Sequence, residues 1–104
     1  MPFDAMDYES ATLVTDMLRS GRRKVEAGWC QRRMRRAGSV CMIGALSVTD
    51  YDSFVHAEEL FLQAIRLLGF DYTSVPSFND APGRTQSEVL TVYDQAIELS
   101  RATA

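Results

Sequence analysis

The sequence has few of the residues from which disulfide frameworks and metal sites are built. It contains two cysteines and one histidine among 104 residues. Cys30 and Cys41 are separated by ten residues, whereas redox pairs and zinc knuckles place two cysteines about two residues apart. We therefore expect two free, buried thiols, no metal and no other cofactor.

Long apolar runs and glycine-rich catalytic motifs are also missing. No stretch approaches the roughly 18 consecutive apolar residues of a membrane span. Asp4 and Asp7 stand where a secretory signal would be basic and then apolar, so we expect a cytoplasmic protein without a membrane partner. The glycine patterns of phosphate loops, dinucleotide sites and nucleophile elbows do not occur. These observations argue against an enzyme.

The overall composition is that of an ordinary globular protein. Hydrophobic residues make up 46% of the chain and charged residues 24%. This balance and length predict one small domain over residues 1–104. A chain of this size buries about 60 to 65% of its unfolded surface, which is sufficient for a thin core without metals or disulfides.

Two helices are predicted from apolar residues at steps of three and four. The first covers residues 8–27; Asp7 or Ser10 can cap its start and a left-handed Gly28 can end it. The second covers residues 51–68, which form the clearest amphipathic stripe.

The ends of the second helix carry their own signals. Thr49 or Asp50 would cap its start. Gly69 suits the glycine position that ends a helix, with Phe70 folding back on Ile65.

A third long helix is predicted by a capping box. Thr85 and Glu88 have the spacing at which the threonine hydroxyl accepts from the Glu88 amide and the carboxylate reaches back. Helical periodicity then continues to near the chain end. The preceding residues, 71–84, are rich in turn formers and predict a structured loop. Asn79 and Asp80 are expected to close a turn there and orient the start of the last helix.

The segment between the first two helices is ambiguous, because its apolar residues fit one face of a helix or of a strand. A turn at Ala37 and Gly38 favours two short antiparallel strands, 29–35 and 39–42. Such a turn pairs Met34 with Cys41 and moves Cys30 away from Cys41. The uncharged apolar run 41–46 is expected to be buried and to open a short helix.

The predicted fold is therefore mainly α, with three long helices and one short helix packed on a two-stranded β-hairpin. The predicted core comprises Val14, Leu18, Ile43, Leu46, Phe61, Ile65, Leu68, Val92 and Ile97.

Several strings resemble an uncharacterised family of small bacterial and phage proteins, a domain of unknown function. Phe78-Asn79-Asp80, a short loop and Glu88-Val89 resemble the family's Trp-Asn-Asp and Glu-Val signature. Gly28-Trp29 and the Cys41–Leu46 run are similar to two further family features. The resemblance covers about residues 20–98 and differs at Phe78, where the family has Trp, and in the arginine-rich stretch before Cys41. It implies a mainly helical fold with a small hairpin, and no known activity.

Charge is distributed unevenly. Residues 19–36 carry seven arginines, one lysine and one acid, for a local charge of +7, whereas the remaining three basic and thirteen acidic residues give −10. Guanidinium groups pair bidentately with phosphates and carboxylates, and Trp29 could stack on a base. The same arginines could instead complement a helix dipole and neutralise the acidic half within the fold or in a homodimer.

Cys41, His56 and Asp80 are the residue types of a catalytic Cys-His-Asp constellation. Cys41 opens an apolar run, where a thiol is inert, and His56 lies on the polar side of its helix. We therefore expect no catalytic residues.

Three functions remain: an interaction protein such as a phage or mobile-element inhibitor, a nucleic-acid-binding module, and an enzyme. We favour the first, with a larger protein as partner and nucleic acid as the alternative. Whether the basic segment or the acidic remainder makes the contact stays open. The candidate partner-binding residues are Arg22, Arg23, Trp29, Arg32, Arg33, Arg35 and Arg36.

Overall fold

The structure, a computed structural model, describes the backbone of residues 5–102 and the side chains of residues 13–102. Within these residues the predicted fold class is confirmed, with four helices and one two-stranded antiparallel hairpin. The elements are α1 (Ala5–Ala27), β1 (Arg35–Arg36), β2 (Ser39–Val40), α2 (Tyr51–Leu67), α3 (Val75–Asn79) and α4 (Gln86–Ala102).

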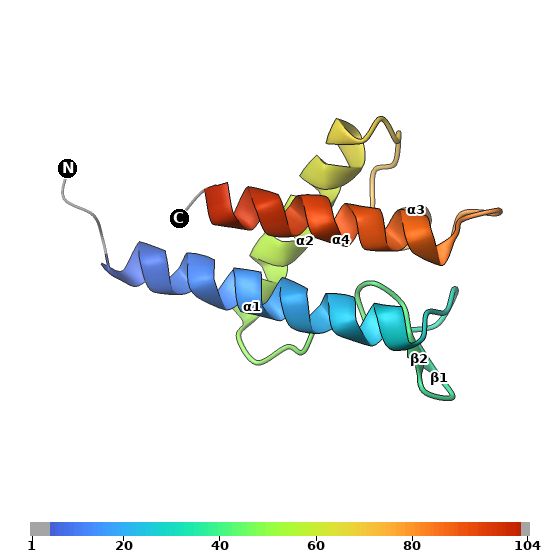
Figure 1. Cartoon of the computed structure of the whole chain (residues 1–104), viewed down its shortest axis with the longest axis horizontal. Helices are drawn as coiled ribbons and strands as arrows, with labels where there is room; N and C mark the ends of the chain where they lie inside the picture. Colours follow the sequence, from blue (N-terminus) through green and yellow to red (C-terminus); the bar gives the residue numbers. More distant parts are fainter. Residues whose placement is uncertain (1–4, 103–104) are drawn as a thin grey trace.

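The three long helices make the framework. Helices α1 and α4 run antiparallel side by side, and α2 crosses behind them (Figure 1). The β1–β2 hairpin lies at the carboxyl-terminal end of α1, and α3 packs against α2. No helix in this part of the chain is long and apolar enough to cross a membrane.

The core lies where the three long helices meet. The Phe61 ring of α2 packs edge-on against Tyr93 of α4, with ring centroids 4.7 Å apart. The Tyr93 hydroxyl donates a 2.6 Å hydrogen bond to the Met42 carbonyl oxygen, and burial raises the pKa of this phenol far above its ordinary value. Of the predicted core, only Ile43 and Leu68 are half-buried, and both pack against the buried cluster.

Helix α1 ends at Ala27 as predicted, but its start and the role of Gly28 differ from the prediction. It begins at Ala5, so Asp7 and Ser10 lie inside the helix and do not precede it; their side chains are outside the described residues. Gly28 is not left-handed, and its amide donates to the Lys24 carbonyl oxygen as a helical residue would. A Cβ at Gly28 would lie 3.0 Å from Oγ of Ser39 and 3.3 Å from the Gly38 carbonyl oxygen, so the end of α1 and the hairpin approach each other closely there.

The ends of α2 are as predicted. Asp50 is the N-cap residue, and its carboxylate accepts a 3.2 Å hydrogen bond from the Ser53 amide. Gly69 has φ of 90°, and the Phe70 amide donates to the Ile65 carbonyl oxygen over 3.0 Å. The cap and the glycine stop both depend on contacts between residues three to five positions apart in the sequence.

The short helix lies at a different place from the one predicted. Residues 41–46 form a turn, in which the Ala45 amide donates to the Cys41 carbonyl oxygen over 2.9 Å. The expected loop 71–84 instead contains α3, which Ser74 caps. Five residues are too few to show a helical period, and the sequence signals for this helix are the Ser74 cap and Pro76 in its first turn.

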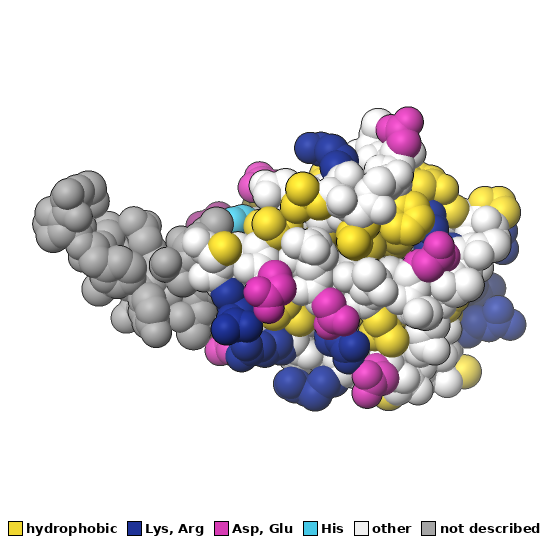
Figure 2. All heavy atoms as spheres, turned by 45° about the horizontal axis from the view of Figure 1, so that its top comes forward, with side chains coloured by type: hydrophobic (Ala, Val, Ile, Leu, Met, Phe, Trp, Pro, Cys, Tyr) yellow, Lys and Arg dark blue, Asp and Glu magenta, His cyan; other side chains and the backbone are white. Residues whose placement is uncertain are grey.

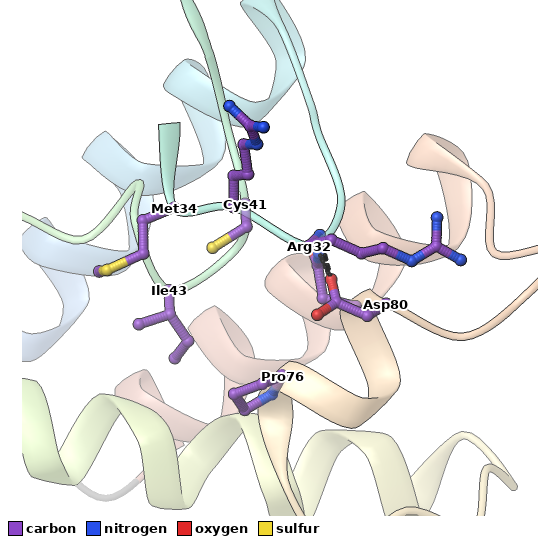
Figure 3. A pocket seen from close by; sticks show the side chains of 8 residues that line it. Arg32, Met34, Cys41, Ile43, Pro76 and Asp80 are labelled. Atoms are coloured by element: carbon purple, nitrogen blue, oxygen red, sulfur yellow. Dashed lines mark hydrogen bonds between the residues drawn. The ribbon is translucent and has the colours of Figure 1, made fainter. Parts of the chain in front are cut away.

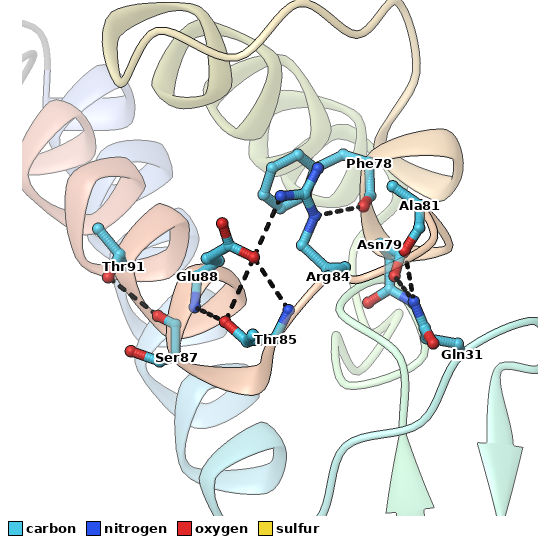
Figure 4. A network of polar contacts seen from close by, with 9 residues as sticks. All are labelled: Gln31, Phe78, Asn79, Ala81, Arg84, Thr85, Ser87, Glu88 and Thr91. Atoms are coloured by element: carbon cyan, nitrogen blue, oxygen red, sulfur yellow. Dashed lines mark hydrogen bonds and ion pairs between the residues drawn. The ribbon is translucent and has the colours of Figure 1, made fainter.

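The capping box at the start of α4 is confirmed (Figure 4). The Thr85 amide donates to Oε1 of Glu88 over 3.0 Å, and the Glu88 amide donates to Oγ1 of Thr85 over 3.1 Å. The hydrogen bond from the Thr85 backbone lowers the pKa of Glu88. The helix then buries one stripe, consisting of Val89, Val92, Tyr93, Ala96, Ile97 and Ser100.

Candidate functional site

The arginine-rich segment forms a hairpin around the predicted turn. Ala37 and Gly38 both have positive φ, 47° and 89°, the combination that a tight two-residue hairpin turn requires. Arg35 pairs with Val40. The Cys41 amide donates to the Met34 carbonyl oxygen over 3.0 Å, which confirms the predicted pairing of these two residues.

Residues 29–34 do not form the predicted extended strand. Trp29 makes an isolated parallel bridge with Val40, through hydrogen bonds from the Val40 amide to the Gly28 carbonyl and from the Cys30 amide to the Val40 carbonyl. Cys30 and Cys41 each follow directly on a residue of that bridge. This second pairing places Cys30 beside Val40, the residue that precedes Cys41.

Both cysteines are free thiols and half-buried, less covered than predicted. The Cys30 thiol donates a 3.4 Å hydrogen bond to the Arg33 carbonyl oxygen. Burial raises the pKa of Cys30, which disfavours the reactive thiolate form.

Asn79, at the end of α3, forms hydrogen bonds with the segments on both sides of the hairpin. Its side chain is 1% exposed. Its Oδ1 accepts from Nε1 of Trp29 over 2.8 Å and from the Met42 amide over 3.1 Å, and its Nδ2 donates to the Cys30 carbonyl oxygen over 3.2 Å. The amide thus joins three points of the chain around the hairpin.

Two neighbours of Asn79 extend this attachment. The Asp80 carboxylate accepts a 2.7 Å hydrogen bond from the Arg32 amide. The Gln31 side-chain amide donates to the carbonyl oxygens of Asn79 and Ala81, each over 3.0 Å. Asn79 and Asp80 were predicted to close their own turn, but their side chains bind a segment nearly fifty residues away.

The hairpin presents four exposed arginines. We call Arg32, Arg33, Arg35 and Arg36 the hairpin arginines; all four are exposed. Arg32 has φ of 65°, in the left-handed region that few residues other than glycine adopt. Among residues 13–102, no acidic side chain forms an ion pair with any of these four. Their charge therefore faces solvent.

The other predicted site residues have different surroundings. Arg22 donates hydrogen bonds to Asp94 over 2.6 Å and to Glu26 over 2.8 Å, and these two bonds raise its pKa. Arg22 thus neutralises acidic side chains within the fold. On the face in Figure 2, acidic side chains likewise lie beside basic ones. Arg23 is exposed, and Trp29 is half-buried against the core.

One basic residue that the sequence analysis did not single out is built into the structure. The Arg84 guanidinium lies 3.8 Å from the centre of the Phe78 ring and also faces Phe70 and Tyr72. It donates to the Phe78 carbonyl oxygen over 2.8 Å (Figure 4) and pairs with Glu88 at 3.3 Å. With a side chain 6% exposed, Arg84 links α3 to α4 and is covered from partners.

A cavity of about 260 Å³ lies between the hairpin segment and α3 (Figure 3). Cys41 and Asp80 both line it, whereas His56 lines a different cavity. The structure therefore does not bring the three residues of the Cys-His-Asp constellation to one cavity. Over the described part of the chain, no group of three or more His, Cys, Asp or Glu side chains could hold a metal ion.

The comparison with known proteins places the chain in a family. The sequence profile of the family described as "Family of unknown function (DUF6197)" matches residues 9–99. The chain belongs to this family. The DUF6197 match agrees with the expected membership of an uncharacterised family, and it covers the hairpin, Asn79 and the capping box together. No curated protein and no solved structure matches the chain.

Proposed function

We propose that this protein is a small, non-enzymatic interaction protein that docks on an acidic surface of a larger protein through its hairpin arginines. The observation that carries the proposal is the exposure of four guanidinium groups on one short hairpin segment. Arginine pairs bidentately with carboxylates and is favoured at protein interfaces. The hairpin is therefore the contact surface, in preference to the acidic remainder.

Preorganisation of the hairpin supports a binding role. The Asn79 side chain, the Asp80 carboxylate and the Met34–Cys41 hydrogen bond all fix the backbone from which the arginines project. A surface held in this way loses less conformational freedom on binding than a flexible loop, so more of the contact energy appears as affinity.

A protein partner is favoured over nucleic acid for two reasons. The chain has a net charge of −3 and a pI near 5.0, so its long-range attraction to a polyanion is weak. The indole N–H of Trp29 is bonded to Asn79 and its ring packs on the core, which leaves little of it for stacking on a base. The proposal includes a cytoplasmic location and, following the resemblance, an inhibitor or effector role in a bacterial or phage setting.

The test compares two double variants with the same change in charge. Arg33→Ser with Arg35→Ser removes two hairpin arginines; Arg19→Ser with Arg66→Ser removes two exposed arginines outside the hairpin. Partners captured from a native-host lysate are identified and titrated against each variant. We expect the hairpin variant to lose most of its affinity for an acidic partner and the control to retain it.

A gel-shift titration with DNA and RNA tests the alternative. Binding whose log K falls with log salt by about 0.9 per neutralised phosphate, and whose slope drops by about two in the hairpin variant, would establish a nucleic-acid module. Sedimentation of the protein alone tests the homodimer. Retention of all binding by the hairpin variant contradicts the proposal.

A further inference from the structure

The cavity beside the hairpin has an apolar interior. Met34, Ile43, Pro76 and Cys41 line it, together with the polar residues Arg32, Arg33, Asn79 and Asp80 (Figure 3). Met34 is a large apolar residue, yet it is 58% exposed; it lies between Arg33 and Arg35. An unbranched, polarisable methionine on a surface adapts readily to an incoming apolar group.

Charged residues also line this cavity. The Asp80 carboxylate, in the wall, accepts hydrogen bonds from the Arg32 amide and from Nδ2 of Asn79. Arg32 and Arg33 also line the cavity, and in Figure 3 the Arg32 side chain points away from Met34, Ile43 and Pro76. The apolar part of the lining therefore favours an apolar group, while the exposed arginines beside it favour anions.

We propose that this cavity receives one apolar side chain, of the size of Leu, Met or Phe, from an acidic segment of the partner protein. This inference rests on the proposed function and names the chemistry that the hairpin recognises. Carboxylates on either side of the apolar residue pair with the hairpin arginines. A free carboxylate or phosphate can pair with the arginines but leaves the apolar lining uncovered, whereas a peptide can contact both.

The probes are short fluorescent peptides with one central residue flanked on both sides by Asp and Glu. The central residue is Leu, Phe or Gly, so the charge is constant across the set. Burial of a Leu or Phe side chain predicts binding at least about tenfold tighter than that of the Gly peptide, measured by anisotropy at low salt.

Three variants separate the cavity from the arginines. Met34→Ser removes an exposed wall and should abolish most of the preference for Leu over Gly. Leu67→Ser, at an apolar side chain 64% exposed on α2, is the matched control and should leave the preference unchanged. Arg35→Ser should weaken the Leu and Gly peptides by the same factor.

Cys41 provides an independent readout because it lines the cavity. In a Cys30→Ser background, the Leu peptide should slow alkylation of Cys41 by iodoacetamide several-fold, and the Gly peptide at equal occupancy should not. Equal affinities of all peptides, lowered by Arg35→Ser, overturn the cavity inference and leave the proposed function standing. Absence of any peptide binding overturns the inference, and tight retention of duplex DNA in the same assay overturns the proposed function as well.

Discussion

The indole N–H of Trp29 donates a 2.8 Å hydrogen bond to Oδ1 of Asn79, fifty positions further along the chain. The same oxygen accepts from the Met42 amide. One buried side-chain oxygen thus joins the end of α1, the turn after the hairpin and the end of α3. These hydrogen bonds hold the backbone on both sides of the hairpin arginines.

Removing the Asn79 amide should destabilise the fold strongly. Asn79→Ala leaves the Trp29 indole and the buried Met42 amide without their acceptor, and each unsatisfied group costs about 1 to 3 kcal/mol. We expect a loss of about 2 to 4 kcal/mol in urea unfolding followed by circular dichroism. Ser87→Ala, an exposed position in α4, is the control and should remain within about 0.5 kcal/mol of wild type. Equal stability of the two variants would refute the junction.

The core contact between α2 and α4 can be tested within one helix. Phe61→Ala empties a fully buried site against Tyr93 and should cost about 3 to 5 kcal/mol. Leu67→Ala changes a side chain on α2 that is 64% exposed and should change stability by less than about 0.5 kcal/mol. Thermal and urea unfolding give both values, and wild-type melting of the Phe61 variant would disprove the core assignment.

Gly44 is predicted to tolerate no side chain. A Cβ there would lie 2.2 Å from the Met34 carbonyl oxygen, which is backbone and already accepts from the Cys41 amide. Gly44→Ala should therefore displace the hairpin and cost about 1 to 3 kcal/mol or more. In Gly83→Ala, no atom lies within 4 Å of the new Cβ and the cost comes only from the positive φ of 78°, about 1 kcal/mol. A smaller loss for Gly44→Ala than for Gly83→Ala contradicts the close approach.

Glu88 predicts a dependence of stability on pH. The folded state lowers the pKa of Glu88 below its ordinary 4.5, so the ionised carboxylate stabilises the fold above about pH 4.5. This contribution is lost as the pH falls through the lowered pKa. The stability difference between wild type and Glu88→Gln should be largest at neutral pH and shrink in acid.

The measurement for Glu88 is urea unfolding of both proteins across that range. Glu59→Gln, at an exposed position of α2, controls for the change in net charge. A difference between wild type and Glu88→Gln that is constant with pH would show that the carboxylate contributes no ionic stabilisation to the capping box.

Much of the fold was predictable because its signals are local. The Thr85–Glu88 box, the Asp50 cap and the Gly69 stop involve residues within about one helical turn, where spacing alone determines geometry. The Ala37-Gly38 turn belongs to this class, since positive φ at both positions selects the hairpin. The short helix was misplaced because α3 has five residues, fewer than periodicity needs.

The candidate site was only half predictable. Composition identified the arginines, but not that Arg22 is paired with Asp94 while the hairpin arginines are exposed. Nothing in the spacing marked Asn79 as a buried junction or Arg84 as a guanidinium stacked on three aromatic rings. Asn and Asp beside prolines are typical of turns, and this local reading concealed a long-range role.

By itself, the sequence determined where the long helices lie, how two of them are capped and where the hairpin turns, since these depend on neighbours a few residues apart. Tertiary structure alone decided which charges are neutralised, why residue 44 is a glycine, and how the cavity forms beside Met34. Those features depend on backbone and side chains brought together from distant parts of the chain. A hydrogen bond such as that between Trp29 and Asn79 exists only after the helices have packed.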